Sequence, residues 1–164
     1  MRKIMLVMAI LLLFINLKSE SSTNQTSIYI DKYNAIAVNL MKEYNVPASV
    51  ILGISMLESA NGTSKLSKNN NNYFGIRTVK GPYIKFENDE QSFLHFAKLI
   101  STSKIYSKHY NYLVDNNIYD YNIWLDRIKL SGYATDPNWS IKVKNIINRH
   151  ELYRFDDEVI SYLK

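Results

Sequence analysis

The sequence feature that most constrains the fold is a long stretch with almost no charge. Between Val46 and Ser64 the only charged residue is Glu58, and most of the segment is apolar. A helix that is apolar on nearly all sides lies inside a domain, so other elements must surround this one. Pro47 suits a first helical turn and Asn61-Gly62 is a stop signal, which predicts a buried central helix that ends just before this pair.

From the other segments we expect short helices around one β-hairpin. Apolar residues recur at helical spacing along most of the chain, and Asn88 followed by Gln91 resembles a capping box. A length of 164 residues gives room for one domain, which we place at residues 28–155. Many helical segments and one hairpin predict an α+β fold, mainly α, for this domain. The pattern does not place residues 156–164, which we treat as a tail. The expected helices are 27–44, 88–101, 103–115, 120–131 and 140–153, and the expected strands are 74–77 and 83–86.

The N-terminus has the pattern of a secretory signal peptide. Arg2 and Lys3 precede an apolar run at residues 4–15, and small polar residues follow. The run is too short to span a bilayer comfortably as a helix. We expect residues 1–19 to be a signal peptide and residues 20–27 to be a flexible tether. The chain would then be secreted or periplasmic, and the alternative is an uncleaved anchor.

Composition excludes several classes of function. The sequence has no cysteine, which rules out disulfides, thiol catalysis and cysteine-bound metals. Its three histidines stand far apart, without the spacing of zinc ligands, so we expect no metal and no cofactor. The net charge is +5, but no basic run or nucleic-acid motif accompanies it. We therefore expect no nucleic-acid partner, and no membrane partner once the signal peptide is removed.

Glu58 is the strongest candidate for a catalytic residue. It follows Ile54 by four residues and Ile51 by seven, which places it on the core-facing side of the central helix. Burial raises the pKa of a carboxyl group, and an acid that stays protonated at neutral pH is suited to general acid catalysis. The alternative is a partly exposed Glu58 at the helix end, paired with Lys65.

Several blocks of sequence occur in a characteristic order and spacing. They include Ile-Ser-Met-Leu-Glu-Ser-Ala-Asn-Gly at 54–62, Asn-Asn-Tyr-Phe-Gly-Ile-Arg at 71–77 and Gly-Tyr-Ala-Thr-Asp-Pro at 132–137. Together these blocks resemble the signature of glycoside hydrolase family 73, the bacterial endo-β-N-acetylglucosaminidases of the autolysin and flagellar-hydrolase kind. The resemblance covers about Tyr29 to Phe155, which is nearly the whole chain after the signal peptide.

This resemblance implies a lysozyme-like helical domain with a short β-hairpin lobe beside a glycan cleft. It implies peptidoglycan glycan strands as partner and substrate, cut at the β-1,4 bond after N-acetylglucosamine. Glu58 corresponds to the family's general acid, and Tyr133 corresponds to a tyrosine beside the cleaved sugar. The residues expected in substrate binding are Asn71, Asn72, Phe74 and Asp136.

A second catalytic carboxylate is harder to assign. Family members usually carry a longer hairpin lobe with a second acid, whereas residues 78–85 here contain no Asp or Glu. Glu90 is the candidate second acid, although an acid is also favoured in the first turn of a helix. Because Glu58 is the one carboxyl group that the sequence assigns with clear support, we expect the acetamido group of the substrate to act as the nucleophile. Trp124 and Trp139 are candidates for stacking on sugars, but both fit helical patterns and Trp124 is better explained as core.

Two other functions are compatible with the same residues. A lytic transglycosylase needs only one acid and has a similar fold. A peptidoglycan-binding or assembly module would keep the fold without turnover, and the shortened lobe fits that alternative. The lone acid in an otherwise uncharged buried helix favours an enzyme, because a binding module gains nothing from the cost of burying it. The sequence does not indicate an oligomeric state.

Overall fold

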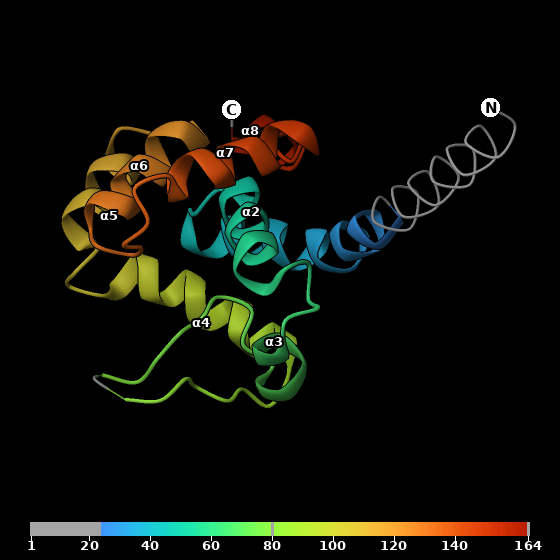
Figure 1. Ribbon diagram of the computed structural model, residues 1–164. Coiled ribbons are helices and arrows are strands. Elements are labelled where there is room, and N and C mark those ends of the chain that lie inside the picture. The colour runs from blue at the N-terminus through green and yellow to red at the C-terminus, as the bar shows by residue number, and fades with distance from the viewer. Residues whose placement is uncertain (1–23, 80, 164) are drawn as a thin grey trace, which may run out of the picture. The chain divides into compact units, whose positions relative to one another are not determined.

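The computed structural model describes residues 24–79 and 81–163, and these are mainly helical (Figure 1). The chain divides into two compact units, residues 1–32 and 33–164. The candidate site lies within the second unit. The mainly helical fold expected from the sequence is therefore confirmed.

The N-terminal predictions are only partly covered by the described residues. The predicted signal peptide lies outside them. The described part of the predicted tether, residues 24–27, is helical and continuous with the helix that runs to residue 44. Among the described helices, none has the length and apolar character needed to cross a membrane.

Helix α2 (Ala48–Ser59) is the predicted central helix. All of its residues except Leu57 and Glu58 are buried. It ends at Ala60, whose left-handed backbone (φ 50°) stops the helix just before the predicted stop signal. Helices α7 (Trp139–Arg149) and α8 (Arg154–Leu163) pack against it on one side and α4 (Asp89–Thr102) contacts it on the other (Figure 1). The uncharged stretch is thus surrounded, as its composition requires.

The close packing of α2 against α7 depends on Gly53. A Cβ atom built on Gly53 would lie 2.8 Å from Cγ1 of Ile147, which is closer than such atoms approach each other. A residue without a side chain therefore lets the two helix backbones come together. This contact fixes the position of α7 relative to the end of α2 that carries Glu58.

The remaining helices lie close to their predicted positions. Helix α4 begins as the sequence predicts, because the side chain of Asn88 accepts a hydrogen bond from the backbone N–H of Gln91 at 2.9 Å. The predicted helix 140–153 corresponds to α7, which ends four residues early at Arg149, and a turn at residues 150–153 leads into α8. Residues 156–163, which the pattern did not place, are part of α8. The other helices are α3 (Lys65–Asn70), α5 (Ser107–Asp115) and α6 (Tyr121–Leu130).

The predicted β-hairpin is not confirmed. The loop between α3 and α4 is extended, but its described residues contain only one antiparallel bridge, between Arg77 and Tyr83. The buried amide of Asn72 replaces part of a strand ladder: its Nδ2 donates to the carbonyl oxygens of Ile76 and Ile84 at 2.8 and 2.9 Å, and its Oδ1 accepts from Ile76 N–H at 3.0 Å. One side chain therefore joins the two arms of the loop.

An aromatic cluster holds this loop against α4. The ring of Phe74 stacks on Phe96 with centroids 4.2 Å apart and meets Phe93 edge-on at 5.0 Å. Tyr73 lies against Phe93 as well, at 5.7 Å. Buried aromatic rings supply large apolar contact areas, so the base of the loop is fixed although it has no strands.

Candidate active site

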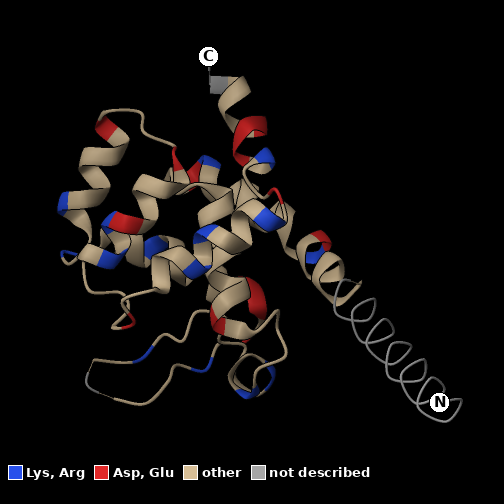
Figure 2. Cartoon of the chain, turned by 45° about the horizontal axis from the view of Figure 1, so that its top comes forward, with Lys and Arg blue, Asp and Glu red and all other residues tan. Residues whose placement is uncertain are grey.

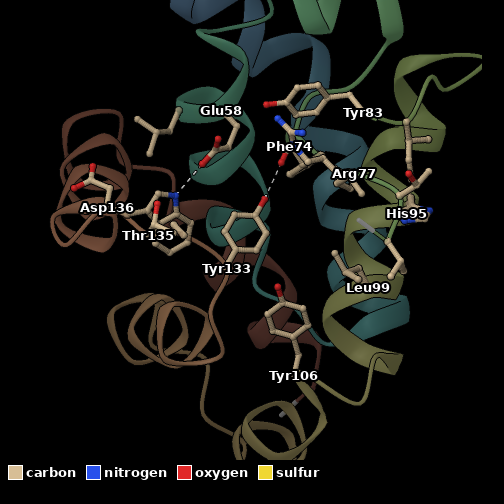
Figure 3. Close-up of a pocket in the computed structure, with 18 of the residues that line it drawn as sticks. Glu58, Phe74, Arg77, Tyr83, His95, Leu99, Tyr106, Tyr133, Thr135 and Asp136 are labelled. Carbon is tan, nitrogen blue, oxygen red and sulfur yellow. Dashed lines mark hydrogen bonds between the residues drawn. The ribbon is translucent and has the colours of Figure 1, made fainter. Parts of the chain in front are cut away.

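A cleft of about 1020 Å³ opens at the C-terminal end of α2 (Figure 3). It is lined by the last residues of α2, by the loop between α3 and α4, and by the segment that leads into α7. Side chains of α4 also contribute to the lining. The predicted site residues Glu58, Phe74, Tyr133 and Asp136 meet in this cleft, and Trp139, a candidate for stacking on sugars, also lines it.

Glu58 lies in the last turn of α2, where its side chain is half-buried. Its Oε1 accepts a hydrogen bond from the indole Nε1 of Trp139 at 2.8 Å, so its partner is Trp139 rather than Lys65. Burial raises the pKa of the Glu58 carboxyl, and the hydrogen bond from Trp139 partly opposes that rise. The carboxyl group therefore holds its proton to higher pH than an ordinary glutamic acid does.

Trp139 is a site residue whose role the sequence analysis missed. It is the first residue of α7, and with 3% of its surface exposed it offers little of its ring for stacking on a sugar. A buried indole needs an acceptor for its N–H group, and the acceptor here is Glu58. No pattern in the sequence connects the two residues, which are 81 positions apart.

Tyr133 stands beside Glu58 in the cleft (Figure 3). Its hydroxyl donates to the backbone carbonyl of Phe74 at 3.1 Å, and its ring lies 5.1 Å from that of Trp139. Burial, and then the nearby Glu58 carboxylate, raise the pKa of the Tyr133 hydroxyl well above its ordinary value. The hydroxyl therefore stays neutral, and its oxygen keeps lone pairs that can accept a hydrogen bond.

The second oxygen of Glu58 lies beside the backbone of Gly75. Gly75 has a φ of 65°, a conformation that residues with side chains rarely adopt. A Cβ at this position would lie 3.8 Å from Oε2 of Glu58. Oε2 has no hydrogen-bond partner among the described residues and is not buried, so it is open to the cleft that Glu58 lines, while Oε1 is held by Trp139.

Asp136 is the other carboxylate that lines the described part of the cleft. It forms an ion pair with Lys142 at 2.7 Å and accepts a hydrogen bond from the backbone N–H of Asn138 at 2.9 Å. These two contacts, Lys142 first, lower the pKa of the Asp136 carboxyl, so the group is ionised at neutral pH. The carboxylate also holds the chain just before α7, and thereby the position of Trp139.

The two asparagines predicted to bind substrate lie outside the cleft lining. Asn71 ends α3 with a left-handed backbone (φ 49°), and its Nδ2 donates to the carbonyl oxygens of Phe86 and Glu87. The amide of Asn72 is used fully within the loop. Both side chains therefore shape the loop, and of the three loop residues predicted to bind substrate only Phe74 lines the cleft.

Glu90 does not come near Glu58 in the cleft. It lies in the first turn of α4, is exposed to solvent and is absent from the residues that line the cleft. Glu87 is also outside the cleft, where its carboxylate accepts a hydrogen bond from Gln91. An acid in the first turn is favoured by the helix dipole, which accounts for Glu90 at this position.

The chain is similar to bacterial proteins named as a glucosaminidase and as an autolysin. A family model described as Glucosaminidase, mannosyl-glycoprotein endo-beta-N-acetylglucosaminidase, matches residues 34–152. Exo-glucosaminidase LytG of Bacillus subtilis is 25% identical over 160 residues, which cover 85% of this chain and 57% of LytG. The Autolysin of Enterococcus faecalis is 26% identical over 163 residues, or 83% of this chain and 22% of that protein. The chain thus spans little more than half of one curated relative and about a fifth of the other.

A solved structure has the same fold. The catalytic domain of the autolysin Auto from Listeria monocytogenes superposes with a TM-score of 0.69 at 22% identity, and the match covers 80% of this chain and 88% of that domain. Because the identity is low, this likeness concerns the fold and not the chemistry.

Proposed function

This chain belongs to the glucosaminidase family, glycoside hydrolase family 73, and from that premise we propose that it is an exported hydrolase of peptidoglycan. Its substrate is the glycan strand, cut at the β-1,4 bond after N-acetylglucosamine. The observation that carries the proposal is the carboxyl group of Glu58, half-buried in a large cleft and with a raised pKa.

In this proposal Glu58 is the general acid. Because Oε1 accepts the indole N–H of Trp139, the transferable proton belongs on Oε2, which faces the cleft at Gly75. Burial raises the pKa of the carboxyl and so favours the protonated form that a general acid needs. When the proton passes to the glycosidic oxygen, a carboxylate forms, and the hydrogen bond from Trp139 stabilises it.

We propose that the acetamido group of the substrate acts as the nucleophile. Glu87 and Glu90 lie outside the cleft lining, and Asp136 is engaged by Lys142 and by the backbone before α7. No second carboxylate of the described cleft is therefore free to take that role. The oxygen of Tyr133 is placed beside Glu58 where it can accept a hydrogen bond from the acetamido N–H.

Product analysis tests the proposed reaction. Purified peptidoglycan is digested, and the first product is examined by proton NMR and mass spectrometry. We expect a reducing N-acetylglucosamine end that is initially in the β configuration. An initial α product would point to a protein base that activates water, and a 1,6-anhydro-muramic product would show a lytic transglycosylase instead. Binding without any product would support a non-catalytic module.

The same digests decide where along the strand the enzyme acts. LytG is named an exo-glucosaminidase, whereas the family model carries the name of an endo-glucosaminidase. We propose endo action for this chain. Endo action produces oligosaccharides of many lengths from the beginning of the digest, whereas exo action releases one small product from the strand ends.

A further inference from the structure

One side of the cleft is formed by a segment that carries basic residues and no acidic ones. From Ser59 to Phe86 the sequence contains no Asp or Glu. Figure 2 shows basic positions along the loop between α3 and α4. The basic residues of this segment are Lys65, Lys68, Arg77, Lys80 and Lys85. Such a segment attracts anions to this side of the cleft.

Arg77 is the member of this group that lines the cleft. Its guanidinium carbon lies 3.8 Å from the centre of the Tyr83 ring, and the two residues face each other across the antiparallel bridge. Stacking uses the flat face of the guanidinium, so the N–H donors at its edge remain available. In Figure 3 Arg77 and Tyr83 lie to one side of Glu58, and Asp136 lies to the other.

Arg77 has no counter-ion among the residues that the structure describes. No Asp or Glu of this part of the chain forms an ion pair with it, whereas Lys142 of the same cleft is paired with Asp136. Arg77 is thus a planar cation that is held on an aromatic ring, lines the same cleft as Glu58 and lacks a protein anion among the described residues. Such a group is suited to bind a carboxylate of the substrate.

We infer that Arg77, held on Tyr83, binds a carboxylate of the N-acetylmuramic acid unit next to the bond that is cleaved. This inference rests on the proposed function. N-Acetylglucosamine is neutral, whereas muramic acid carries a lactyl group. That group ends either in a free carboxylate or in a peptide stem with carboxylates of its own.

The test compares two forms of one substrate. Purified peptidoglycan is used either untreated or after its carboxyl groups have been converted to amides with a carbodiimide and ammonia. We expect the wild-type protein to prefer the untreated strands by about tenfold in kcat/KM, the size of one charge-assisted hydrogen bond. Arg77→Gln should abolish this preference by slowing only the reaction on untreated strands. Arg77→Lys keeps the charge without the planar fork and should retain part of the preference.

Lys85→Gln is the matched control. Lys85 lies in the same loop, is exposed and does not line the cleft, so its variant removes the same charge from the loop and should keep the preference. Equal rates of the wild type on both substrates, an equal slowing of both by Arg77→Gln, or a lost preference in Lys85→Gln would each overturn the inference. In all three results hydrolysis itself persists, and the proposed function stands. A wild-type protein that hydrolyses neither form would overturn the proposed function, and this inference with it.

A third substrate identifies the source of the carboxylate. Strands from which an amidase has removed the peptide stems carry only lactyl carboxylates. If the wild type prefers these strands over their amidated form, and Arg77→Gln does not, Arg77 binds the lactyl carboxylate. If the preference requires intact stems, Arg77 binds a carboxylate of the peptide. Both results agree with the inference.

Discussion

The two oxygens of Glu58 have different surroundings, and this difference defines the residue's proposed chemistry. Oε1 is held by the indole N–H of Trp139, and Oε2 faces the cleft at Gly75. Burial favours the protonated acid, whereas the indole favours the carboxylate. Trp139 therefore limits how far burial raises the pKa of Glu58, and it fixes which oxygen can donate.

Replacement of Trp139 by phenylalanine tests this balance. The indole N–H is lost, so the pKa of Glu58 should rise further and the alkaline limb of the pH profile of kcat should move to higher pH. Turnover at neutral pH should fall by roughly tenfold or more, because a hydrogen bond to a charged group contributes about 1.5–3 kcal/mol. Trp124→Phe is the control, since Trp124 is also buried but its Nε1 donates to the carbonyl of Ile118. An unchanged alkaline limb in Trp139→Phe would refute the role given to Trp139.

Tyr133→Phe separates turnover from binding. The variant keeps the ring against Trp139 and loses the hydroxyl that contacts the carbonyl of Phe74. If the hydroxyl oxygen orients the acetamido group, kcat should fall while KM changes little. Steady-state rates on soluble wall fragments give both constants. A raised KM with unchanged kcat would instead make Tyr133 a residue that binds substrate and transition state equally.

The sequence predicted part of this site. Glu58 was predictable from physics, because it is the only charge in a buried helix. The presence of Tyr133 and Asp136 in the cleft followed only from the family resemblance, since one tyrosine among thirteen has no distinguishing pattern. The loop-shaping roles of the predicted substrate-binding asparagines, Asn71 and Asn72, were not visible. An amide that binds the backbone and an amide that binds a sugar look the same in a sequence.

At the scale of elements, helices were predictable and their long-range connections were not. The helical spacing and the Asn88 cap gave the start of α4 to within a residue. The hairpin was predicted from two apolar segments around a turn, but the side chain of Asn72 makes contacts that a strand ladder would have made. Helix α8 was missed because the contact that anchors it joins Asp156 to Ser49, which are 107 residues apart.

Asp156 gives the protein a pH-dependent stability. Its buried carboxylate accepts hydrogen bonds from the backbone N–H of Ser49 at 2.8 Å and from the Ser49 hydroxyl, so α8 caps the start of α2. Burial raises the pKa of Asp156 to about 7. The folded protein thus binds this proton more tightly than the unfolded chain, and the resulting stability is present below about pH 4 and is lost as the pH rises to about 7.

Asp156→Asn should remove this pH dependence. The amide keeps an acceptor for the Ser49 N–H group and cannot titrate, so urea unfolding at pH 5 and pH 8 should give more similar stabilities than in the wild type. Asp156→Ala should lose about 1–2 kcal/mol at either pH, because α2 then lacks its cap. An identical pH slope in Asp156→Asn and the wild type would contradict the raised pKa.

At the scale of the whole molecule, the site joins segments that are far apart in the chain. Glu58 comes from α2, and Phe74 and Arg77 come from the loop between α3 and α4. Tyr133 comes from the segment that leads into α7, and Trp139 is the first residue of α7. Two hydrogen bonds connect these parts, one from Trp139 to Glu58 and one from Tyr133 to Phe74. The Gly53 contact between α2 and α7 supports the same arrangement from within the core.

The measurement that tests this account most directly is the activity of Glu58→Gln on purified cell walls, by zymography and by the release of reducing ends. The amide keeps the shape of the side chain and its contact with Trp139, but it has no proton to transfer. We expect activity to fall by about 10²–10⁴-fold while the melting temperature and circular dichroism stay close to those of the wild type. Glu90→Gln, in the exposed first turn of α4, should remain as active as the wild type. A folded Glu58→Gln protein that retains activity within about tenfold of the wild type would contradict the assignment of Glu58 as the general acid.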